Sequence, residues 1–248
     1  MITGSVAKKI SGRGIDMKEI TMEKIREMAS APSGSALSLE NCWMEHMDLR
    51  GLNLRALDFT LVSFRDVRFD GNDLSGISFN NALLDGCSMA GCDLRGCDLR
   101  KASMRRVNLT GADLRGADVR GAVLEDAVMT DLRVDERTRG YRMRCPETGA
   151  FIGWKKCLDD RIVMLLVPAD SPRTSATNHT CRCRRAKVLK IENFDQTESY
   201  QEAWSLVDPD FCYRRGEWVE ALNFNPDRWY DSTGGIHFWM ERQEALRY

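Results

Sequence analysis

The chain has 248 residues, a formal net charge of −1 and nine cysteines. A chain of this length can bury a substantial core and can hold two domains. The near-neutral charge gives no general attraction to nucleic acid or to an anionic membrane, so we expect neither DNA binding nor membrane association. No apolar run reaches the ~18–20 residues needed to span a bilayer. The start of the chain also lacks the apolar stretch that is typical of a secretory signal.

Residues 1–36 form the first of three predicted regions. Residues 1–14 show no periodicity, and we expect them to be flexible. Asp16, with Glu19 three residues later, is typical of a capping box and predicts a helix over residues 17–29. We expect this helix to cap the open end of the structure that follows. Binding to a partner or to a second copy of the chain is the alternative role for the helix.

A five-residue repeat then runs without insertion over residues 37–134. Every fifth residue from Leu39 to Val134 is large and apolar, which gives twenty central positions in one register. The residue two places before each central position is apolar or small in every repeat except the one with Asn72. Glycine is common two places after the central position. Such a fixed period indicates a repeat architecture.

A period of five fits neither an α-helix, at 3.6 residues per turn, nor a simple strand, at 2. It suits a coil in which short straight sides alternate with tight corners. The central residue and the residue two places earlier then point inward, while the residues on either side of the centre point outward. Glycine two places after the centre relieves the strain of the corner.

The segments GADLR, GADVR and GCDLR resemble the pentapeptide-repeat family, whose pattern is A(D/N)LXX. The resemblance implies a right-handed quadrilateral β-helix, a β-solenoid with four repeats in each coil. Twenty repeats would form roughly five coils, a structure on the order of 24 Å tall at about 4.8 Å between stacked strands. We call this region the column. Cys42, Cys87, Cys92 and Cys97 occupy its inward, Ala-like positions, and we expect a reduced, cytoplasmic protein.

The outer sides of the column differ in their residues. Two neighbouring sides carry Asp just before the central residue and Arg just after it, which predicts rows of self-compensating charge: Asp93, Asp98, Asp113 and Asp118 with Arg95, Arg100, Arg115 and Arg120. The side centred on Phe64, Leu84, Met104 and Leu124 instead turns Leu83 and Val123 outward. This side is our candidate docking face for a protein.

Some members of the family bind DNA gyrase and resemble DNA in shape and negative surface. The column carries twelve basic and fifteen acidic side chains, and its arginines lie where an acidic stripe would be needed. Its unbroken register also leaves no room for the inserted loops of the quinolone-resistance members. These features argue against the gyrase role, so binding of gyrase or another topoisomerase by the column is only the second alternative.

Residues 135–248 follow other patterns and predict an α+β domain with mostly antiparallel strands. Its segments rich in β-branched and aromatic residues are FIGWKKC, DRIVMLLVP, CRCRRAKVLKI, CYRRGEWV and GGIHFWM, and ERQEALRY predicts a closing helix. The segments CPETGAFIGWKK, VPADSPRTSAT and GIHFWMERQEA resemble an uncharacterised domain that follows pentapeptide repeats in phage and bacterial proteins. That resemblance makes a phage origin plausible and implies no activity.

Three groups of residues in this domain are candidates for a site. Arg173, Ser175, Thr177, Arg182 and Arg184 could bind an anion, because guanidinium and hydroxyl groups both bind phosphate oxygens. His237 could activate Cys181 as a nucleophile if the fold brings them together. His179, Cys181 and Cys183 alternate along one strand face, roughly 6.5–7 Å apart, which is too far for three ligands of one tetrahedral ion. We therefore expect no metal and no cofactor.

The sequence favours a non-enzymatic interaction protein. In this hypothesis the column is a rigid spacer that presents the C-terminal domain to a protein partner or a small anionic ligand, and a phage-encoded protein would act on a host protein. The sequence leaves the oligomeric state open. A homodimer formed through the terminal coils or the N-terminal helix is one possibility, since twofold symmetry is the usual outcome. The alternative is an enzyme or nucleotide-handling domain centred on Arg173, His179, Cys181 and His237.

Overall fold

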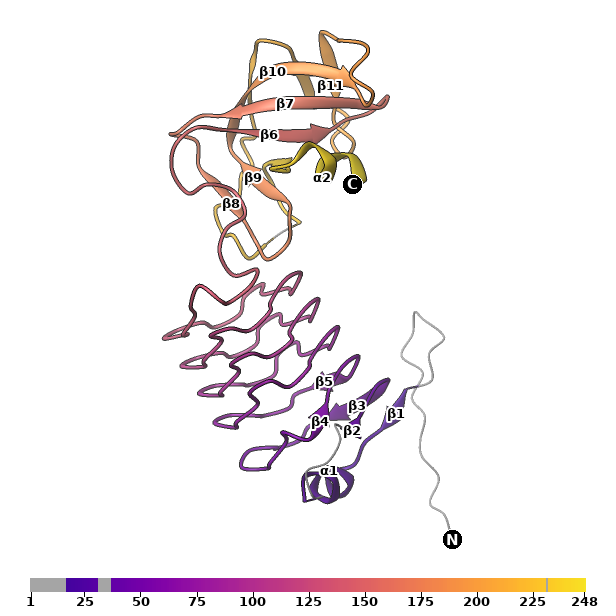
Figure 1. The fold of residues 1–248 in the computed structure, drawn as a ribbon, viewed down its shortest axis with the longest axis vertical. Helices are drawn as coiled ribbons and strands as arrows, with labels where there is room; N and C mark the ends of the chain where they lie inside the picture. The colour runs from indigo at the N-terminus through magenta and orange to yellow at the C-terminus, as the bar shows by residue number, and fades with distance from the viewer. Residues whose placement is uncertain (1–16, 31–36, 231) are drawn as a thin grey trace. The chain divides into compact units, whose positions relative to one another are not determined.

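The computed structural model describes residues 17–30, 37–230 and 232–248, and the prediction of flexibility for residues 1–14 lies outside them. The chain divides into two compact units, Met1–Arg142 and Met143–Tyr248. Figure 1 shows a stack of coils in the first unit and a group of strands with one short helix in the second. No helix among the described residues is long and apolar enough to cross a membrane.

Parallel pairing between residues twenty positions apart builds the column. Strand β2 (Leu37–Ser38) pairs with β4 (Leu57–Asp58), and β3 (Cys42–Glu45) pairs with β5 (Ser63–Arg65). Single bridges continue the pattern from one coil to the next, as in Asp98↔Asp118. A spacing of twenty residues is four pentapeptides per coil, which confirms the predicted β-helix for the repeat region.

Both inward series fill the interior of the column. The central residues from Leu39 to Leu124 are at most 4% exposed, whereas Met129 and Val134 in the last coil are half-buried. Four phenylalanine rings, three from consecutive repeats and one from the following coil, form one cluster with ring centroids 5.2–6.3 Å apart: Phe59, Phe64, Phe69 and Phe79. Aromatic pairs at these distances add to the stability gained from their burial.

Asn72, the one polar residue in the second inward series, has a specific role in the coil. Its Nδ2 donates to the carbonyl of Leu49 and its Oδ1 accepts from the N–H of Gly51, both at 2.8 Å. Inward cysteines also bind the coil before them, since the thiol of Cys97 donates to the carbonyl of Leu74 at 2.9 Å. Burial raises the pKa of the Cys97 thiol to about 12. This inward cysteine is therefore a packed thiol.

The N-terminal helix differs from the prediction. Helix α1 spans Met22–Ala29, and the Oγ1 of Thr21 caps it by accepting from the N–H of Lys24 at 3.3 Å. The prediction of a helix from residue 17 was wrong, because Lys18–Glu19 form strand β1, which pairs in parallel with β3. The predicted capping box also includes Asp16, which lies outside the described residues. Ile25 on α1 is fully buried, which supports the proposal that the helix caps the column.

The second unit contains the remaining strands. Its largest sheet is antiparallel in the order β13-β10-β7-β6: β6 (Phe151–Lys156), β7 (Arg161–Val167), β10 (Arg185–Asn193) and β13 (Trp218–Glu220). A three-stranded sheet has the order β14-β9-β8: β8 (Arg173–Ser175), β9 (Cys181–Cys183) and β14 (Ile236–Phe238). Strands β11 (Glu202–Trp204) and β12 (Cys212–Arg214) pair with each other, and helix α2 spans Arg242–Arg247.

A large apolar core and a smaller cluster around Ile162, Trp239 and Ala245 fill this second unit. The large core contains side chains from β6, β7, β9, β10 and β14, among them Leu165, Val188 and Phe238. Phe238 packs directly over Gly153 of β6, where a Cβ would lie 2.5 Å from its ring. The backbones of Trp154 and Trp239 exchange two hydrogen bonds of 2.8 Å, which joins β14 to the edge of the larger sheet. The two sheets therefore meet at β6.

The corners of the column give a stability prediction. Arg106 is an exposed corner residue with a φ of 55°, a left-handed conformation that disfavours residues with a side chain. We expect Arg106→Gly to raise the free energy of unfolding by about 0.5–1 kcal/mol, measured by chemical denaturation. Ala56 occupies the equivalent corner of another repeat without a left-handed φ. Ala56→Gly should therefore lower the stability, and a gain in both variants would contradict the argument.

Candidate functional site: an arginine-lined groove on the column

The predicted rows of Asp and Arg form as paired side chains. The Nε and Nη2 of Arg95 donate to the two carboxylate oxygens of Asp93, at 2.8 and 2.5 Å. The same carboxylate accepts from the backbone N–H of Arg95 at 3.1 Å. This geometry follows from the repeat, because one inward residue separates two outward ones and so leaves them on the same face. Identical pairs form at three other repeats: Asp98–Arg100, Asp113–Arg115 and Asp118–Arg120.

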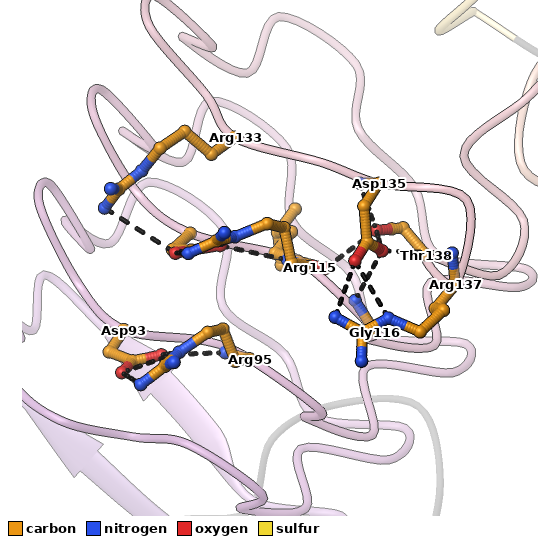
Figure 2. A network of polar contacts seen from close by, with 10 residues as sticks. Asp93, Arg95, Arg115, Gly116, Arg133, Asp135, Arg137 and Thr138 are labelled. Carbon is orange, nitrogen blue, oxygen red and sulfur yellow. Dashed lines mark hydrogen bonds and ion pairs between the residues drawn. The ribbon is translucent and has the colours of Figure 1, made fainter.

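Asp113 is the most enclosed of these carboxylates, at 3% exposed. Hydrogen bonds from the Arg115 side chain lower the pKa of Asp113 to about 2, against the opposing effect of burial. The N–H of Arg115 and the charge of Arg133 lower it further. Figure 2 shows Arg133 reaching down from the following coil, and its Nη2 lies 3.7 Å from Asp113. The carboxylate therefore fixes guanidinium groups from two coils.

Two of the arginine rows border a groove of about 970 Å³. Gly96 and Gly116 lie at the corner between the rows, with φ of 68° and 72°. Because glycine has no side chain, the corner is hollow and forms the floor of the groove. Six arginines from three stacked coils line it: Arg95, Arg100, Arg115, Arg120, Arg137 and Arg139.

The last coil closes one end of this groove with an altered spacing. Asp118 bridges to Arg139, twenty-one residues away, so one extra residue enters the chain here. Figure 2 shows Asp135 at this point, with its Oδ1 accepting from the N–H of Gly116 at 3.0 Å. The same carboxylate accepts from the Nε and Nη2 of Arg137, at 3.0 and 2.8 Å. The Asp135 carboxylate thus takes the place of a backbone carbonyl as the acceptor for the Gly116 N–H, at the corner where the repeat ends.

The chemistry of the groove is that of a binding surface. A guanidinium has five N–H donors, and a bidentate carboxylate uses two of them. The other three donors of each arginine are held in a fixed orientation, with the Arg95, Arg100, Arg115 and Arg120 side chains 43–55% exposed. The described residues that line the groove include no histidine, serine or threonine, and its one thiol, Cys97, is 1% exposed. The arrangement can bind oxygen acceptors, and it offers no nucleophile.

The structure does not gather the residues of the predicted anion site. The guanidinium of Arg173 donates to the carbonyls of Ser171, Gly149 and Pro168. Arg182 is 2% exposed and donates to three carbonyls at 2.9–3.1 Å, those of Asn225, Asp227 and Gly234. Ser175 and Thr177 are buried, and Arg184 forms an ion pair with Glu220. The two inward arginines hold loops in place.

The structure also separates the predicted catalytic and metal-binding residues. In the β14–β9 pairing, Phe238 lies opposite Cys181 and His237 lies opposite Arg182. Side chains of neighbouring residues on a strand point to opposite faces, so His237 and Cys181 do too. His179 is exposed and lies 2.6 Å from Glu244, whereas Cys181 and Cys183 are fully buried. Among the described residues, no group of three or more His, Cys, Asp or Glu side chains could hold a metal ion.

Lys155 is a candidate that the sequence interpretation missed. It lies on β6 with a side chain that is 5% exposed, and it lines two cavities of the second unit. The alternation of FIGWKKC contains the signal, because residues 151, 153, 155 and 157 share one strand face. Three of those four residues are Phe, Gly and Cys, which indicates an inward face that includes a lysine.

Family comparisons agree with this architecture. The model of pentapeptide repeats (8 copies) matches residues 63–100 and 87–126. A second family model, a family of unknown function named DUF5758, matches residues 141–245. This chain is a pentapeptide-repeat protein with a C-terminal DUF5758 domain. No curated protein matches it.

Solved pentapeptide-repeat proteins resemble parts of the chain. Rfr23 from the cyanobacterium Cyanothece 51142 is 21% identical, over 41% of this chain and 89% of that one, with a TM-score of 0.29. A protein of the Arabidopsis thaliana thylakoid lumen is 28% identical, over 42% of this chain and 69% of that one, with a TM-score of 0.25. QnrB1, a plasmid-mediated fluoroquinolone resistance protein, is 11% identical over 41% and 77%, with a TM-score of 0.22.

Asp113 gives a prediction about acid stability. A carboxylate whose pKa is lowered by folding contributes stability above its unfolded pKa, and that stability is lost as the pH falls through the folded pKa. For Asp113 the window runs from pH 3.8 down to about 2. We expect Asp113→Asn to cost about 2 kcal/mol at pH 7 and to flatten the loss of stability within the window, measured by denaturation at several pH values.

Asp48 provides the matched control for this experiment. Arg50 lowers the pKa of Asp48 to about 2 as well, but this pair is exposed to solvent. Exposed ion pairs contribute little to stability, so Asp48→Asn should have a much smaller effect. Equal costs for the two substitutions would contradict the role given to burial at Asp113.

Proposed function

We propose that this pentapeptide-repeat protein is a non-enzymatic interaction protein. The column acts as a rigid spacer and docks a protein partner, and the C-terminal domain is presented to a partner or a small anionic ligand. The single observation that carries the docking role is the convergence of two arginine rows on the glycine floor of one groove. The partner would place an acidic surface in that groove.

The pairing of each arginine explains why an acidic protein fits the groove better than nucleic acid does. Asp carboxylates compensate the guanidinium charges, so the groove has little excess positive charge to displace counterions from phosphates. The free donors are nevertheless fixed in place, at coil spacings of about 4.8 Å. Fixed donors lose little side-chain freedom on binding, which favours a partner whose carboxylates have a matching spacing.

Leu83 and Val123 mark a second proposed docking surface. Leu83 is 51% exposed and Val123 is half-buried, and both belong to the row that also contains Ser63 and Ser103. The neighbouring outward row alternates in sign along the column: Glu45, Arg65, Asp85, Arg105 and Glu125. An apolar side chain beside such a row suits the edge of an interface with a polar rim.

The other predicted roles stay proposals with direct tests. Action on a host protein by a phage-encoded chain predicts a partner from bacterial cells. Binding of DNA gyrase by the column predicts inhibition in a supercoiling assay, although the arginine rows supply donors where DNA supplies phosphate acceptors. An enzymatic role for Arg173, His179, Cys181 and His237 has no support in their positions. A homodimer would appear as twice the chain mass in light scattering.

Arginine substitutions within the groove test the docking proposal. We expect the full-length chain to capture a protein from bacterial lysate, and the double variant Arg100→Gln/Arg120→Gln to capture it at least about tenfold less well. Glutamine keeps the side chain polar but removes the guanidinium charges that pair with Asp98 and Asp118. Quantitative mass spectrometry of the captured protein, followed by a binding measurement with that protein in pure form, provides the readout.

The control substitution keeps the same chemistry outside the groove. Arg50 pairs with Asp48 through its Nε and Nη2, as the groove arginines do with their own aspartates, but it does not line the groove. Arg50→Gln should capture the partner as well as the unaltered chain does. Undiminished binding by the double variant, with thermal unfolding unchanged, would refute the docking role of the groove.

A further inference from the structure

The second unit contains a largely buried lysine whose ammonium has no ion-pair or hydrogen-bond partner among the described residues. Lys155 is 5% exposed, and among the described residues no hydrogen bond or ion pair involves its Nζ. The Nζ lies over the ring of Tyr213, 6.0 Å from its centroid. A buried charge without a partner is strongly unfavourable, because the protein interior does not replace the water that the charge loses.

The environment of Lys155 leaves this cost uncompensated. Burial lowers the pKa of the Lys155 ammonium, and the thiols of Cys157 and Cys183 offset the effect only in part. Tyr213 is 2% exposed, and among the described residues its hydroxyl also forms no hydrogen bond. Lys155 and Tyr213, whose polar groups have no hydrogen-bond partner among the described residues, therefore line the same cavity.

Both residues line open space. Lys155 lines a cavity of about 480 Å³ together with Thr180, Val207 and Trp239. It also lines an adjoining cavity of about 220 Å³ with Tyr213 and Asp208. His237 and Thr233 border both cavities, so the two meet beside Lys155. A cavity of this size, with an apolar wall and a few convergent polar groups, is typical of a small-molecule site.

We propose that the cavity around Lys155 binds the carboxylate of a small molecule whose apolar body lies against Trp239. The carboxylate accepts from the Lys155 ammonium and from the Tyr213 hydroxyl. Such charge-assisted hydrogen bonds supply the partner that the protein itself does not provide. This inference concerns the second unit alone and does not depend on the docking role of the column.

The charge count favours a carboxylate over a phosphate. The Lys155 ammonium balances one negative charge on the ligand. The Asp208 carboxylate, which lines the smaller cavity, repels a second negative charge. The apolar part of the wall also limits the ligand. The Trp239 ring lies tilted against that of Tyr248, with the centroids 4.6 Å apart, and Leu206 and Val207 also line the cavity. An aromatic or aliphatic monocarboxylate satisfies both requirements.

Thermal unfolding of the full-length chain with defined probes tests this site. We expect phenylacetate or octanoate to raise the midpoint of unfolding, and the uncharged phenylacetamide and octanamide to leave it unchanged. Stabilisation by a ligand that binds only the folded state follows from mass action. Lys155→Met should weaken the binding of the acids by about tenfold to a hundredfold, which is the usual effect of losing a hydrogen bond to a charged group.

Two further variants make the result specific. Lys155→Met removes an unpaired buried charge at similar volume, so we expect the variant without ligand to be at least as stable as the unaltered chain. Tyr213→Phe keeps the aromatic ring but removes the hydroxyl, so it should weaken the binding of the acids. Lys156→Met, on the opposite face of β6, should bind them normally.

Several outcomes would overturn the proposal. It fails if Lys155→Met binds the acids as tightly as the unaltered chain, or if the amides bind as well as the acids. It also fails if none of the acids binds at millimolar concentration. Binding of phenyl phosphate without binding of phenylacetate would show that the ligand class is wrong. A Lys155→Met variant that is less stable than the unaltered chain would show that the lysine has a partner within the protein.

Discussion

The hydrogen bonds between residues one coil apart are the constraint on which the column depends. At each side of a coil, the backbone N–H of an outward residue donates to a carbonyl of the coil before it. An example is the N–H of Asp118, which donates to the carbonyl of Cys97 at 2.9 Å. The backbone N–H of the central residue donates to the coil after it, as that of Leu99 does to the carbonyl of Asp118, also at 2.9 Å. These bonds are regular where the coil length is constant, at twenty residues in every coil from Leu37 up to the last one. When the coil length is constant, equivalent residues of successive coils stack on one another. Apolar residues then stack inside, Asp beside Arg outside, and glycine at the corner.

The groove is a consequence of this stacking. Gly96 and Gly116 lie one above the other because they are twenty residues apart, and so do Arg95 and Arg115. A glycine corner beside a single arginine would be a local dent, whereas repeated corners extend the dent along the column. The second unit differs in its electrostatics. The arginines of the groove walls have carboxylate partners, whereas Lys155 in the core has none among the described residues. The first surface suits a macromolecule, and the second suits a small ligand.

The sequence predicted the column well because its structure is local and repeated. Each five-residue unit carries the same pattern, so twenty copies remove the ambiguity that any one of them would leave. The start of α1 was predicted wrongly for the opposite reason: Lys18 and Glu19 pair with Cys42 and Trp43, and a partner so distant in sequence overrides a local capping pattern. Propensity is a weak guide where tertiary contacts compete with it.

The residues of the second unit show a further limit of sequence reasoning. Alternation assigns Arg182 to a strand face, but it does not tell whether that face is buried. Arg182 lies in the interior and binds the carbonyls of a loop more than forty residues away, which no local pattern records. Lys155 was visible as a lysine on an apolar face. What the sequence could not show is that no carboxylate of the described residues forms an ion pair with it, because that depends on the whole fold.

Hydrogen exchange of two insertion variants tests the central claim, that the five-residue register sets the structure of the column. The first variant duplicates Gly86–Ala90, which adds one whole repeat; the second adds a single serine after Gly86. The account predicts that the amides of the coils on both sides stay protected in the first variant, because every later residue keeps its inward or outward position. In the second, protection of the flanking coils should fall, since the apolar series is out of phase across the insertion. Equal protection in the two variants would contradict the account.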